Sequence, residues 1–298
     1  MFTLLLSAAA AQSSLSSKIK NVVVLVQENR SFDSIAGGFT YEPTIDGLVG
    51  KKFCNPANVT DPNSDIVCAD AIVDANDIVK DDPNHSISGT SFGIYSQFAP
   101  DESAIKSGSL KANMNGFVNE QENWYKFRND DARASAILNY YHPTQVPFME
   151  QLGKDYVLFD QWFCSVPGPT NPNRAYITSG TSQGNGNNNF FNLTFGGMTQ
   201  RSIFQQLSEN NITWINYANT TTKLDQPFYP RGTPNNALQG FNPDSLFYDW
   251  TWKSGAVNTN VKTLDKFFAD AKNGNLPQFS YINPECCTYD SMHPPSPI

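Results

Sequence analysis

Hydrophobic residues gather in short continuous runs along this chain, and four of these runs have the composition of β-strands. They are rich in β-branched and aromatic residues and occupy residues 22–26, 156–159, 212–216 and 279–282. The run at 22–26 holds five consecutive aliphatic residues, the pattern of a strand buried on both faces of a parallel sheet. We therefore expect four strands, the first of them in the interior of a sheet.

Between the strand-like runs, apolar residues recur at helical spacing. Residues 134–141 place four of them at i, i+3, i+4 and i+7, on one face of a helix. Three further segments are expected to be helical: residues 146–152, 203–207 and 264–271. Gly153 and Gly274 are the expected stops of the first and third of these, and Thr199 is the expected N-cap of the second. Strands that alternate with helices predict an α/β fold, a mainly parallel sheet flanked by helices, in one domain.

Composition adds two constraints to this pattern. Residues 40–115 are rich in Gly, Pro, Asn, Asp and Ser, which is typical of long loops with short elements. The net charge of -8 and the pI of about 4.8 disfavour nucleic acid as a partner, because nucleic-acid-binding proteins usually present a basic face. An anionic substrate would need local cations to hold it against this overall charge.

The N-terminus has the pattern of a secretory leader. Residues 2–11 form an apolar run that ends in four alanines and is too short to span a bilayer. We expect residues 1–17 to be the signal peptide and leader and residues 18–298 to be the folded domain; the alternative is an N-terminus without a targeting role. Sequons of the Asn-x-Ser/Thr type agree with a secreted glycoprotein; they begin at Asn58, Asn84, Asn192, Asn211 and Asn219.

The five cysteines predict one local disulfide and leave the pairing of the others open. Cys54 and Cys68 flank a polar loop and are placed to form a local disulfide, whereas the adjacent Cys286 and Cys287 bond to each other only with strain. No C-x-x-C pattern indicates a zinc site, and an odd number of cysteines leaves one thiol unpaired within the chain.

The residues that follow each strand are the candidates for chemistry, because open α/β sheets bind ligands at the carboxyl ends of their strands. Glu28 and Asn29 follow the first strand and offer oxygen ligands to a cation; the alternative is a polar turn. Thr170 lies shortly before Pro172, where a hydroxyl either meets an anion at a helix N-terminus or acts only as an N-cap. Arg174 could supply a planar fork for phosphate.

Four segments, taken together, resemble the phosphoesterase family, which includes non-specific phospholipases C and a bacterial acid phosphatase branch. They are NVVVLVQENRSFD at 21–33, DPNHS at 82–86, PTNPNR at 169–174 and DSMHPP at 290–295. They occur in the family's order and span nearly the whole chain, and residues 53–56 are reminiscent of fungal members. The resemblance implies an alkaline-phosphatase-like fold.

The resemblance also implies roles for matching residues. Thr170 would be the nucleophile, and His85 and His293 would contact the phosphoryl group or the leaving group. Arg174 and Asn173 would bind substrate. A divalent metal ion of unknown identity would be held by a set of three residues: Glu28, Asn29 and Thr170. Such a metal lowers the pKa of the hydroxyl and offsets charge on the phosphoryl oxygens.

One departure from the family pattern concerns the metal. Family members carry a further Asp-Glu pair well beyond the Asp-x-x-His-Pro element, whereas the one Asp-Glu dipeptide here, Asp101-Glu102, precedes the nucleophile and is expected to be solvated. This predicts a C-terminally incomplete sheet, with residues 18–298 as the N-terminal portion of a phosphoesterase domain.

The expected function is that of a secreted, metal-dependent phosphoesterase that splits phosphodiesters in the manner of a phospholipase C. Its expected partners are a phospholipid or a small phosphate ester, with peripheral membrane contact and no nucleic acid. Two alternatives stay open at this point: an acid phosphatase that acts on monoesters, and an inactive truncated family member.

Overall fold

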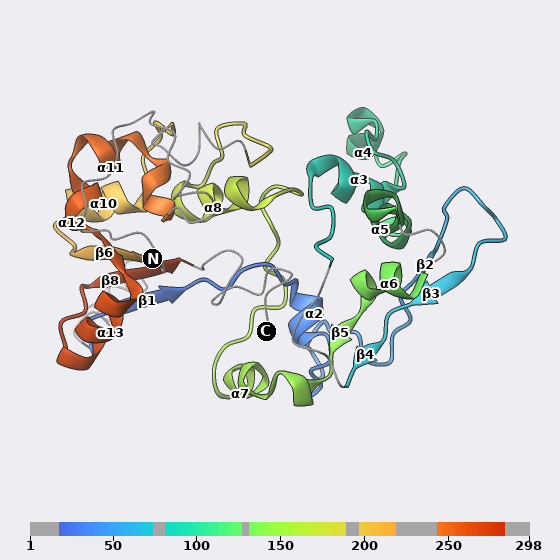
Figure 1. Cartoon of the computed structure of the whole chain (residues 1–298), viewed down its shortest axis with the longest axis horizontal. Coiled ribbons are helices and arrows are strands. Elements are labelled where there is room, and N and C mark those ends of the chain that lie inside the picture. The colour runs from blue at the N-terminus through green and yellow to red at the C-terminus, as the bar shows by residue number, and fades with distance from the viewer. Residues whose placement is uncertain (1–17, 74–80, 127–130, 189–196, 219–242, 284–298) are drawn as a thin grey trace, which may run out of the picture. The chain divides into compact units, whose positions relative to one another are not determined.

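The computed structural model describes residues 18–73, 81–126, 131–188, 197–218 and 243–283 (Figure 1). These residues fall into two compact units. Unit 1 contains the described residues of 18–28, 174–183, 197–218 and 243–283, and unit 2 contains those of 29–173 and 184–188. Helix α8 (Thr170–Ser179) begins in unit 2 and ends in unit 1.

Unit 1 is built on a four-stranded parallel sheet of order β1-β8-β6-β7. Its strands are β1 (Val22–Leu25), β6 (Trp214–Ala218), β7 (Val261–Thr263) and β8 (Phe279–Asn283). Strand β8 is the last of the four in the chain, yet it pairs with both β1 and β6. The expected α/β fold with a mainly parallel sheet is therefore confirmed.

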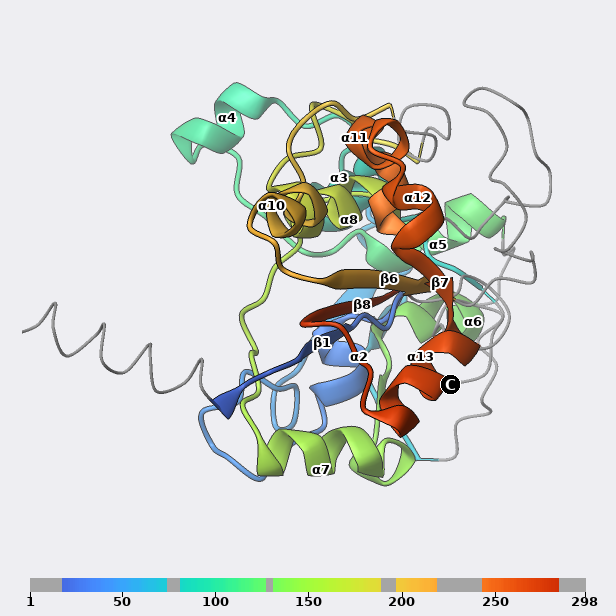
Figure 2. The ribbon, with the colours of Figure 1, turned by 90° about the vertical axis from the view of Figure 1, so that its left-hand side faces the viewer.

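Helices cover both faces of this sheet (Figures 1 and 2). One face carries α10 (Ile203–Glu209), the 3-10 helix η4 (Asp244–Phe247), α11 (Asp249–Lys253) and α12 (Ala256–Thr259). The other face carries α13 (Leu264–Asn273), whose Phe267 ring meets Tyr217 of β6. Alternate residues of β6 therefore pack against different helices.

The core of unit 1 is aromatic. Phe204 of α10 is fully buried, and its ring lies 5.0 Å from Trp214 and 5.7 Å from Tyr281, measured between ring centroids. The Trp214 indole donates to Ser208, so its polar atom is satisfied. These contacts join α10 to the two central strands.

Strand β1 differs from its sequence-based prediction. Val24 packs against the core, but Val23 is 43% exposed and Leu25 is 62% exposed. The strand lies at the edge of the sheet, and α13 contacts β6 and β7. The prediction of a strand buried on both faces is wrong because one face of β1 lacks such a cover in the described structure.

Two helix boundaries also differ from those expected from the sequence: the start of α10 and the end of α7 (Pro147–Asp155). Ser202, and not Thr199, caps α10, since its hydroxyl accepts from the Gln205 amide. Gly153 lies inside its helix and does not end it; a side chain there would meet the Tyr41 hydroxyl at 2.4 Å, so close packing explains this glycine. Gly274, at φ 70°, ends α13 as expected.

Unit 2 consists of short elements joined by loops, as the composition of residues 40–115 predicts. Its helices are α2 (Phe32–Ala36), α3 (Ile87–Tyr95), α4 (Glu102–Ser107), α5 (Phe117–Tyr125), α6 (Asp131–Ser135) and α7 (Pro147–Asp155), with 3-10 turns η1 (Ala136–Leu138) and η2 (Pro143–Gln145). Its strands are β2 (Cys54–Pro56), β3 (Ile66–Cys68), β4 (Ala71–Ile72) and β5 (Tyr140–Tyr141).

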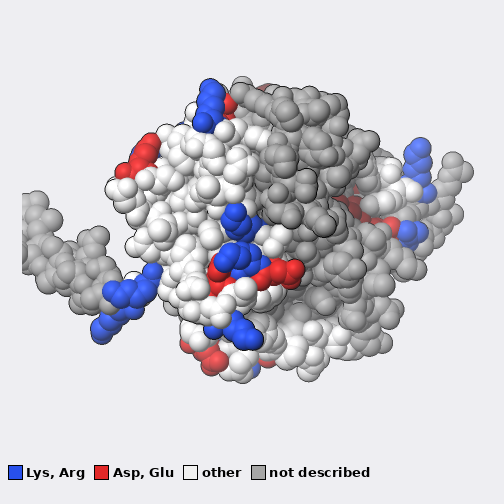
Figure 3. Space-filling model, turned by 60° about the vertical axis from the view of Figure 1, so that its left-hand side comes forward, with Lys and Arg blue, Asp and Glu red and all other residues white. Residues whose placement is uncertain are grey.

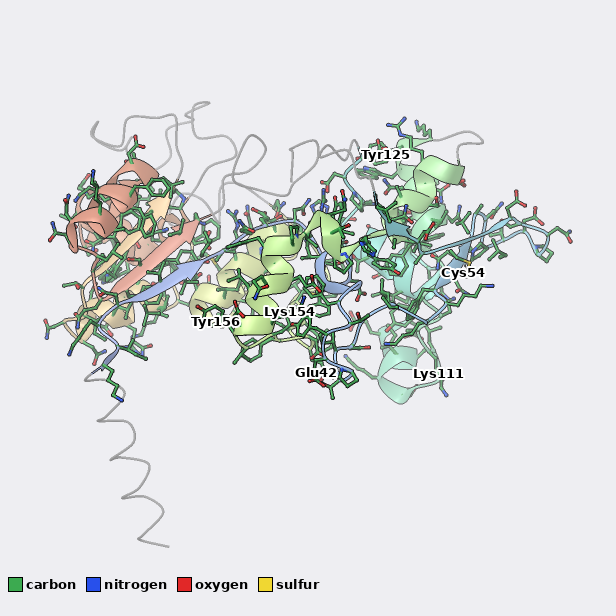
Figure 4. All side chains as sticks on the ribbon, turned by 90° about the horizontal axis from the view of Figure 1, so that it is seen from below. Glu42, Cys54, Lys111, Tyr125, Lys154 and Tyr156 are labelled. Carbon is green, nitrogen blue, oxygen red and sulfur yellow. A yellow bond between two sulfur atoms is a disulfide. The ribbon has the colours of Figure 1, made fainter. Side chains whose placement is uncertain are left out.

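A disulfide closes the β2–β3 hairpin. Cys54 and Cys68 occupy opposite positions in the antiparallel ladder and are bonded, which confirms the local disulfide expected from the sequence (Figure 4 labels Cys54). Such a bond stabilises a hairpin that would be marginal alone. Cys164 is a free, exposed thiol, and Cys286 and Cys287 lie outside the described residues.

The expected strand at residues 156–159 is absent from the described structure. Tyr156, Val157 and Phe159 are 74%, 77% and 68% exposed, and the segment continues into the exposed Trp162 and Phe163. The composition is suited to a strand, but no described strand pairs with it, and a strand needs a neighbour to satisfy its backbone groups. None of the described helices is long and apolar enough to cross a bilayer.

Replacing Phe204 by Ala should strongly destabilise unit 1. The change leaves a cavity among Trp214, Tyr248 and Tyr281 and should lower the free energy of unfolding by about 3–5 kcal/mol. The matched control is Phe268→Ala on α13, where the side chain is 63% exposed and the loss should stay within about 0.5 kcal/mol. Urea denaturation of the three proteins measures both values; equal losses would contradict this assignment of the core.

Candidate active site

The carboxyl edge of the unit 1 sheet carries a buried ion cluster. Glu28 follows β1, and its carboxylate pairs with the Arg174 guanidinium of α8. A second carboxylate, that of Asp244 at the start of η4, lies 3.7 Å from the same guanidinium. Arg174 and Asp244 are 9% and 1% exposed, so one cation and two carboxyl groups share a site that is largely shielded from water.

Strand β8 fixes the position of Asp244. The Tyr281 hydroxyl and the Asn283 amide each donate to its carboxylate, both at 2.7 Å. The Asn283 carbonyl in turn accepts from the Asp244 backbone and from the Asn216 amide of β6. Asn283 ends β8, whereas Tyr281 and Asn216 lie in the middle of β8 and β6, so the pairing of these two strands sets the geometry of the polar atoms.

Burial and charge act against each other in this cluster. Burial alone would lower the pKa of Arg174, but the carboxyl groups of Asp244 and Glu28 outweigh it, and the pKa is raised. Burial raises the pKa of Asp244, and this shift is opposed by Arg174, Tyr281 and Asn283. Arg174 is therefore held in its charged form by its neighbours.

A second polar group lies in unit 2, around the Asp-Pro-Asn-His-Ser segment. Asn29 has a left-handed backbone with φ 78°, a conformation that Asn tolerates better than most residues. Its side-chain amide donates to the Asp82 carboxylate at 3.0 Å. The His85 ring nitrogen Nδ1 lies 3.6 Å from the same carboxylate. The structure thus brings two predicted site residues, Asn29 and His85, onto one carboxylate.

The tautomer of His85 follows from its other contact. Nδ1 lies 2.7 Å from the Pro83 carbonyl oxygen. Because a carbonyl can only accept, Nδ1 is the nitrogen that carries the hydrogen in the neutral ring, and the lone pair is then on Nε2.

Asn84 and Glu120 support this segment. The Asn84 carbonyl accepts from the backbone and hydroxyl of Ser86, the N-cap of α3. Its amide donates to Glu120 of α5, a carboxyl group that is 5% exposed. The other carboxyl oxygen, Oε2, is buried and has no hydrogen-bond partner among the described residues. Burial raises the pKa of Glu120 above its ordinary 4.5, and Asn84 opposes this shift.

The loop before Thr170 is shaped by Asn173. Its side-chain carbonyl accepts from the backbones of Ser165 and Val166, both at 3.0 Å. Its amide donates to the carbonyls of Val166, Gly168 and Pro169. These contacts fold residues 165–169 over the first turn of α8, where Thr170 is the first helical residue. The side-chain hydrogen bonds of Asn173 are thus made to the loop at residues 165–169.

The predicted site residues that the structure describes form two groups, one in each unit. Glu28 and Arg174 meet in unit 1, whereas Asn29, His85, Asn173 and Thr170 belong to unit 2. The convergence of these groups at one site stays a prediction, as does the role of His293, which lies outside the described residues. Asp101 caps α4 and Glu102 is exposed, so the expectation that this dipeptide is solvated is confirmed.

A cluster of His, Cys, Asp or Glu metal ligands is absent from the described residues. Within them, no group of three or more His, Cys, Asp or Glu residues is arranged around a common point. Glu28 is paired with Arg174, and the Asn29 amide faces Asp82.

Comparison with known proteins identifies the family. The Phosphoesterase family model matches residues 19–298. The chain belongs to the Phosphoesterase family. It is 34% identical to non-specific phospholipase C1 of Arabidopsis thaliana over 268 residues, which cover 89% of the chain and 42% of that protein. For non-specific phospholipase C5 of the same plant the values are 33%, 97% and 50%.

A bacterial relative gives a similar picture. The chain is 26% identical to the non-hemolytic phospholipase C of Burkholderia pseudomallei, over 89% of the chain and 37% of that protein. The chain thus spans half or less of the length of each of these relatives. The α/β architecture of the chain is consistent with the alkaline-phosphatase-like fold of the Phosphoesterase family.

Sequence reasoning missed several residues of the candidate site. Asp82 begins the Asp-Pro-Asn-His-Ser motif, but the motif alone assigns it no role, and Asp244, Tyr281 and Glu120 carry no signal in the sequence. The strand-end rule could have identified Asn283, because it ends β8, the strand that pairs with β1. Asp244 follows a long polar segment and reaches the sheet only through the tertiary fold.

A separate cavity in unit 2 contains none of the predicted residues. It encloses about 510 Å³ and is lined by residues that include Tyr41, Glu42, Lys154 and Tyr156, the last three labelled in Figure 4. Lys154 pairs with Glu150 and lies over the Tyr41 ring. On the face of the molecule in Figure 3, the charged side chains of described residues also occur in small groups of mixed sign.

Replacing Glu120 by Gln should remove one pH-dependent part of the stability. A carboxyl group whose pKa is raised by folding stabilises the protein below its unfolded pKa, and this stability is lost as pH rises through the folded pKa. Relative to Glu120→Gln, the wild type should therefore lose stability as pH rises above 4.5. The slope should reach at most about 1.4 kcal/mol per pH unit.

Unfolding in urea between pH 4 and pH 8 measures this difference, with Glu102→Gln on the exposed surface of α4 as the control that should show no such slope. A wild type that gains stability relative to Glu120→Gln as pH rises would show that Glu120 is stabilised as an anion.

Proposed function

We propose that this protein is a secreted, metal-dependent phosphoesterase that hydrolyses phosphodiesters in the manner of a phospholipase C. The observation that carries the proposal is the family match over residues 19–298 together with the phospholipase C names of the relatives. The substrate would be a phospholipid or a small phosphate ester. The contacts among Asn29, Asp82 and His85 agree with a polar site.

In the proposed reaction, Thr170 is the nucleophile. Its Oγ forms a bond to phosphorus, the bond from phosphorus to the leaving alcohol breaks, and water then cleaves the phosphothreonine. The Thr170 hydroxyl proton must leave and the departing alcohol oxygen must gain a proton, and His85 and His293 are the groups proposed for these transfers. Asn173 supports this assignment because it holds the loop that leads to Thr170.

A divalent metal ion is part of the proposal, with Glu28, Asn29 and Thr170 as its proposed ligands. Their oxygen atoms suit a hard cation. Loss of turnover in a chelator, with recovery on adding back one divalent metal, would support this part. Full turnover after exhaustive chelation would remove it.

Secretion is supported by the disulfide between Cys54 and Cys68, because such bonds persist in oxidising compartments. Peripheral membrane contact is supported by the exposed apolar residues at 156–163, among them Trp162 and Phe163. Sedimentation with phosphatidylcholine vesicles tests the second point. Equal sedimentation of the wild type and Trp162→Ser would count against this surface.

Thr170→Ala should abolish the proposed hydrolysis. The expected loss is about a thousandfold or more in turnover of a chromogenic phosphodiester, because a missing nucleophile removes the covalent route. Thr170→Ser retains a hydroxyl and should keep part of the activity. A chromogenic monoester, assayed in parallel, separates phosphodiesterase from acid phosphatase activity. Turnover that survives Thr170→Ala unchanged would exclude Thr170 as the nucleophile, and a wild type without turnover would favour an inactive family member.

Glycan occupancy should differ among the sequons that lie in the described residues. Asn58 and Asn211 are exposed, whereas the amide nitrogen of Asn84, to which a glycan would attach, donates to the buried Glu120. Mass-spectrometric mapping of protein secreted by a eukaryotic host should find glycans at Asn58 or Asn211 and none at Asn84. A fully occupied Asn84 would contradict the packing of this segment, and an intact Met1 on an unglycosylated protein would contradict secretion.

A further inference from the structure

The environment of Arg174 is that of an internal counter-ion. One guanidinium nitrogen pairs with Glu28, and the other terminal nitrogen lies 3.7 Å from Asp244. Side-chain exposure is 11% for Arg174, 13% for Glu28 and 1% for Asp244. Glu28 alone cancels the charge of Arg174, and Asp244 adds to the negative side whenever it is ionised. The cluster therefore has no surplus positive charge to attract a phosphate.

Asp244 is held from the opposite side. Tyr281 and Asn283 of β8 donate to its two carboxyl oxygens, and Asn283 is itself held by Asn216. With both oxygens engaged by a central strand, Asp244 is a fixed anchor. A chain of contacts thus runs from the sheet through Asp244 and Arg174 to Glu28.

We propose that Arg174 is a positioning residue for Glu28, with Asp244 as its anchor, and that Arg174 does not bind the substrate phosphate. The sequence predicted the opposite role, a phosphate fork. A phosphate could reach the guanidinium only by displacing a carboxylate, which would leave that carboxylate buried and unpaired at a high cost. The proposal rests on the proposed function, because it takes Glu28 to be part of the active site.

Two substitutions separate positioning from substrate binding. Arg174→Lys keeps the charge but loses the planar fork that reaches two carboxylates at once. Asp244→Asn keeps the shape of the anchor and removes its charge. A matched control exists on the other face of the same sheet, where Asp270 is 3% exposed, pairs with Lys266 and accepts from the Tyr217 hydroxyl at 3.0 Å. Asp270→Asn therefore disturbs a similar buried group away from Glu28.

The first experiment is steady-state hydrolysis of a chromogenic phosphodiester. Arg174→Lys and Asp244→Asn should each lower kcat by about tenfold or more and change KM by less than about threefold. Asp270→Asn should leave kcat within about twofold of the wild type. A tenfold rise in KM for Arg174→Lys with kcat retained would identify a substrate contact and overturn the proposal, as would an unchanged kcat in Asp244→Asn.

The second experiment does not depend on turnover and so separates this proposal from the proposed function. A double-mutant cycle of Glu28→Gln and Asp244→Asn is measured by urea unfolding in the wild-type background and again with Arg174→Met. The two changes should be non-additive by about threefold or more in the unfolding equilibrium constant, and additive once Arg174 is absent. Additivity in the wild-type background would show that Arg174 does not link the two carboxylates.

Discussion

The parallel pairing of β8 with both β1 and β6 is the constraint on which unit 1 depends. Parallel strands end at the same edge of their sheet, so this pairing places Asn283 at the edge where Glu28 follows β1, and it brings Asn216 of β6 into contact with Asn283 although these residues are far apart in the chain. Asp244, the first residue of η4, then contacts Asn283, and Arg174 of α8 pairs with Glu28. Without β8 between them, β1 and β6 would have no common neighbour, and Asp244 would lose the Tyr281 and Asn283 side chains that hold it.

The same pairing makes the cluster costly. Ionised side chains lose their hydration when they are buried, and only close partners offset that loss. Asp244 gains a tyrosine hydroxyl and an asparagine amide as partners, and Arg174 gains two carboxyl groups. In unit 2, Glu120 is less well compensated, since one of its oxygens has no partner among the described residues. Buried ionisable groups with shifted pKa values are typical of functional sites, where they lower the stability of the fold.

Residue pattern predicted β1, β6, β8, α10 and α13 of unit 1, because hydrophobic periodicity is a local property, but it missed β7, η4, α11 and α12. The run at 279–282 became β8, and Gly274 ended α13 through its positive φ. The sequence-based predictions failed where the local conformation depends on residues that are distant in the chain. Gly153 is required by the Tyr41 hydroxyl, which lies more than a hundred residues earlier, and the apolar run at 156–159 has strand composition but no described strand beside it.

The sequence by itself indicated the family, through the resemblance of four motifs to known members, and the α/β class, through local hydrophobic patterns. It also indicated the disulfide of the β2–β3 hairpin, because Cys54 and Cys68 lie close together in the chain. Only the tertiary structure decided the partners of those motifs. Asp82 became the common neighbour of Asn29 and His85, Asn173 became the support of its loop, and Arg174 was enclosed by Glu28 and Asp244. Charge and hydrogen bonding act over a few ångströms in space, and sequence separation carries little information about such distances.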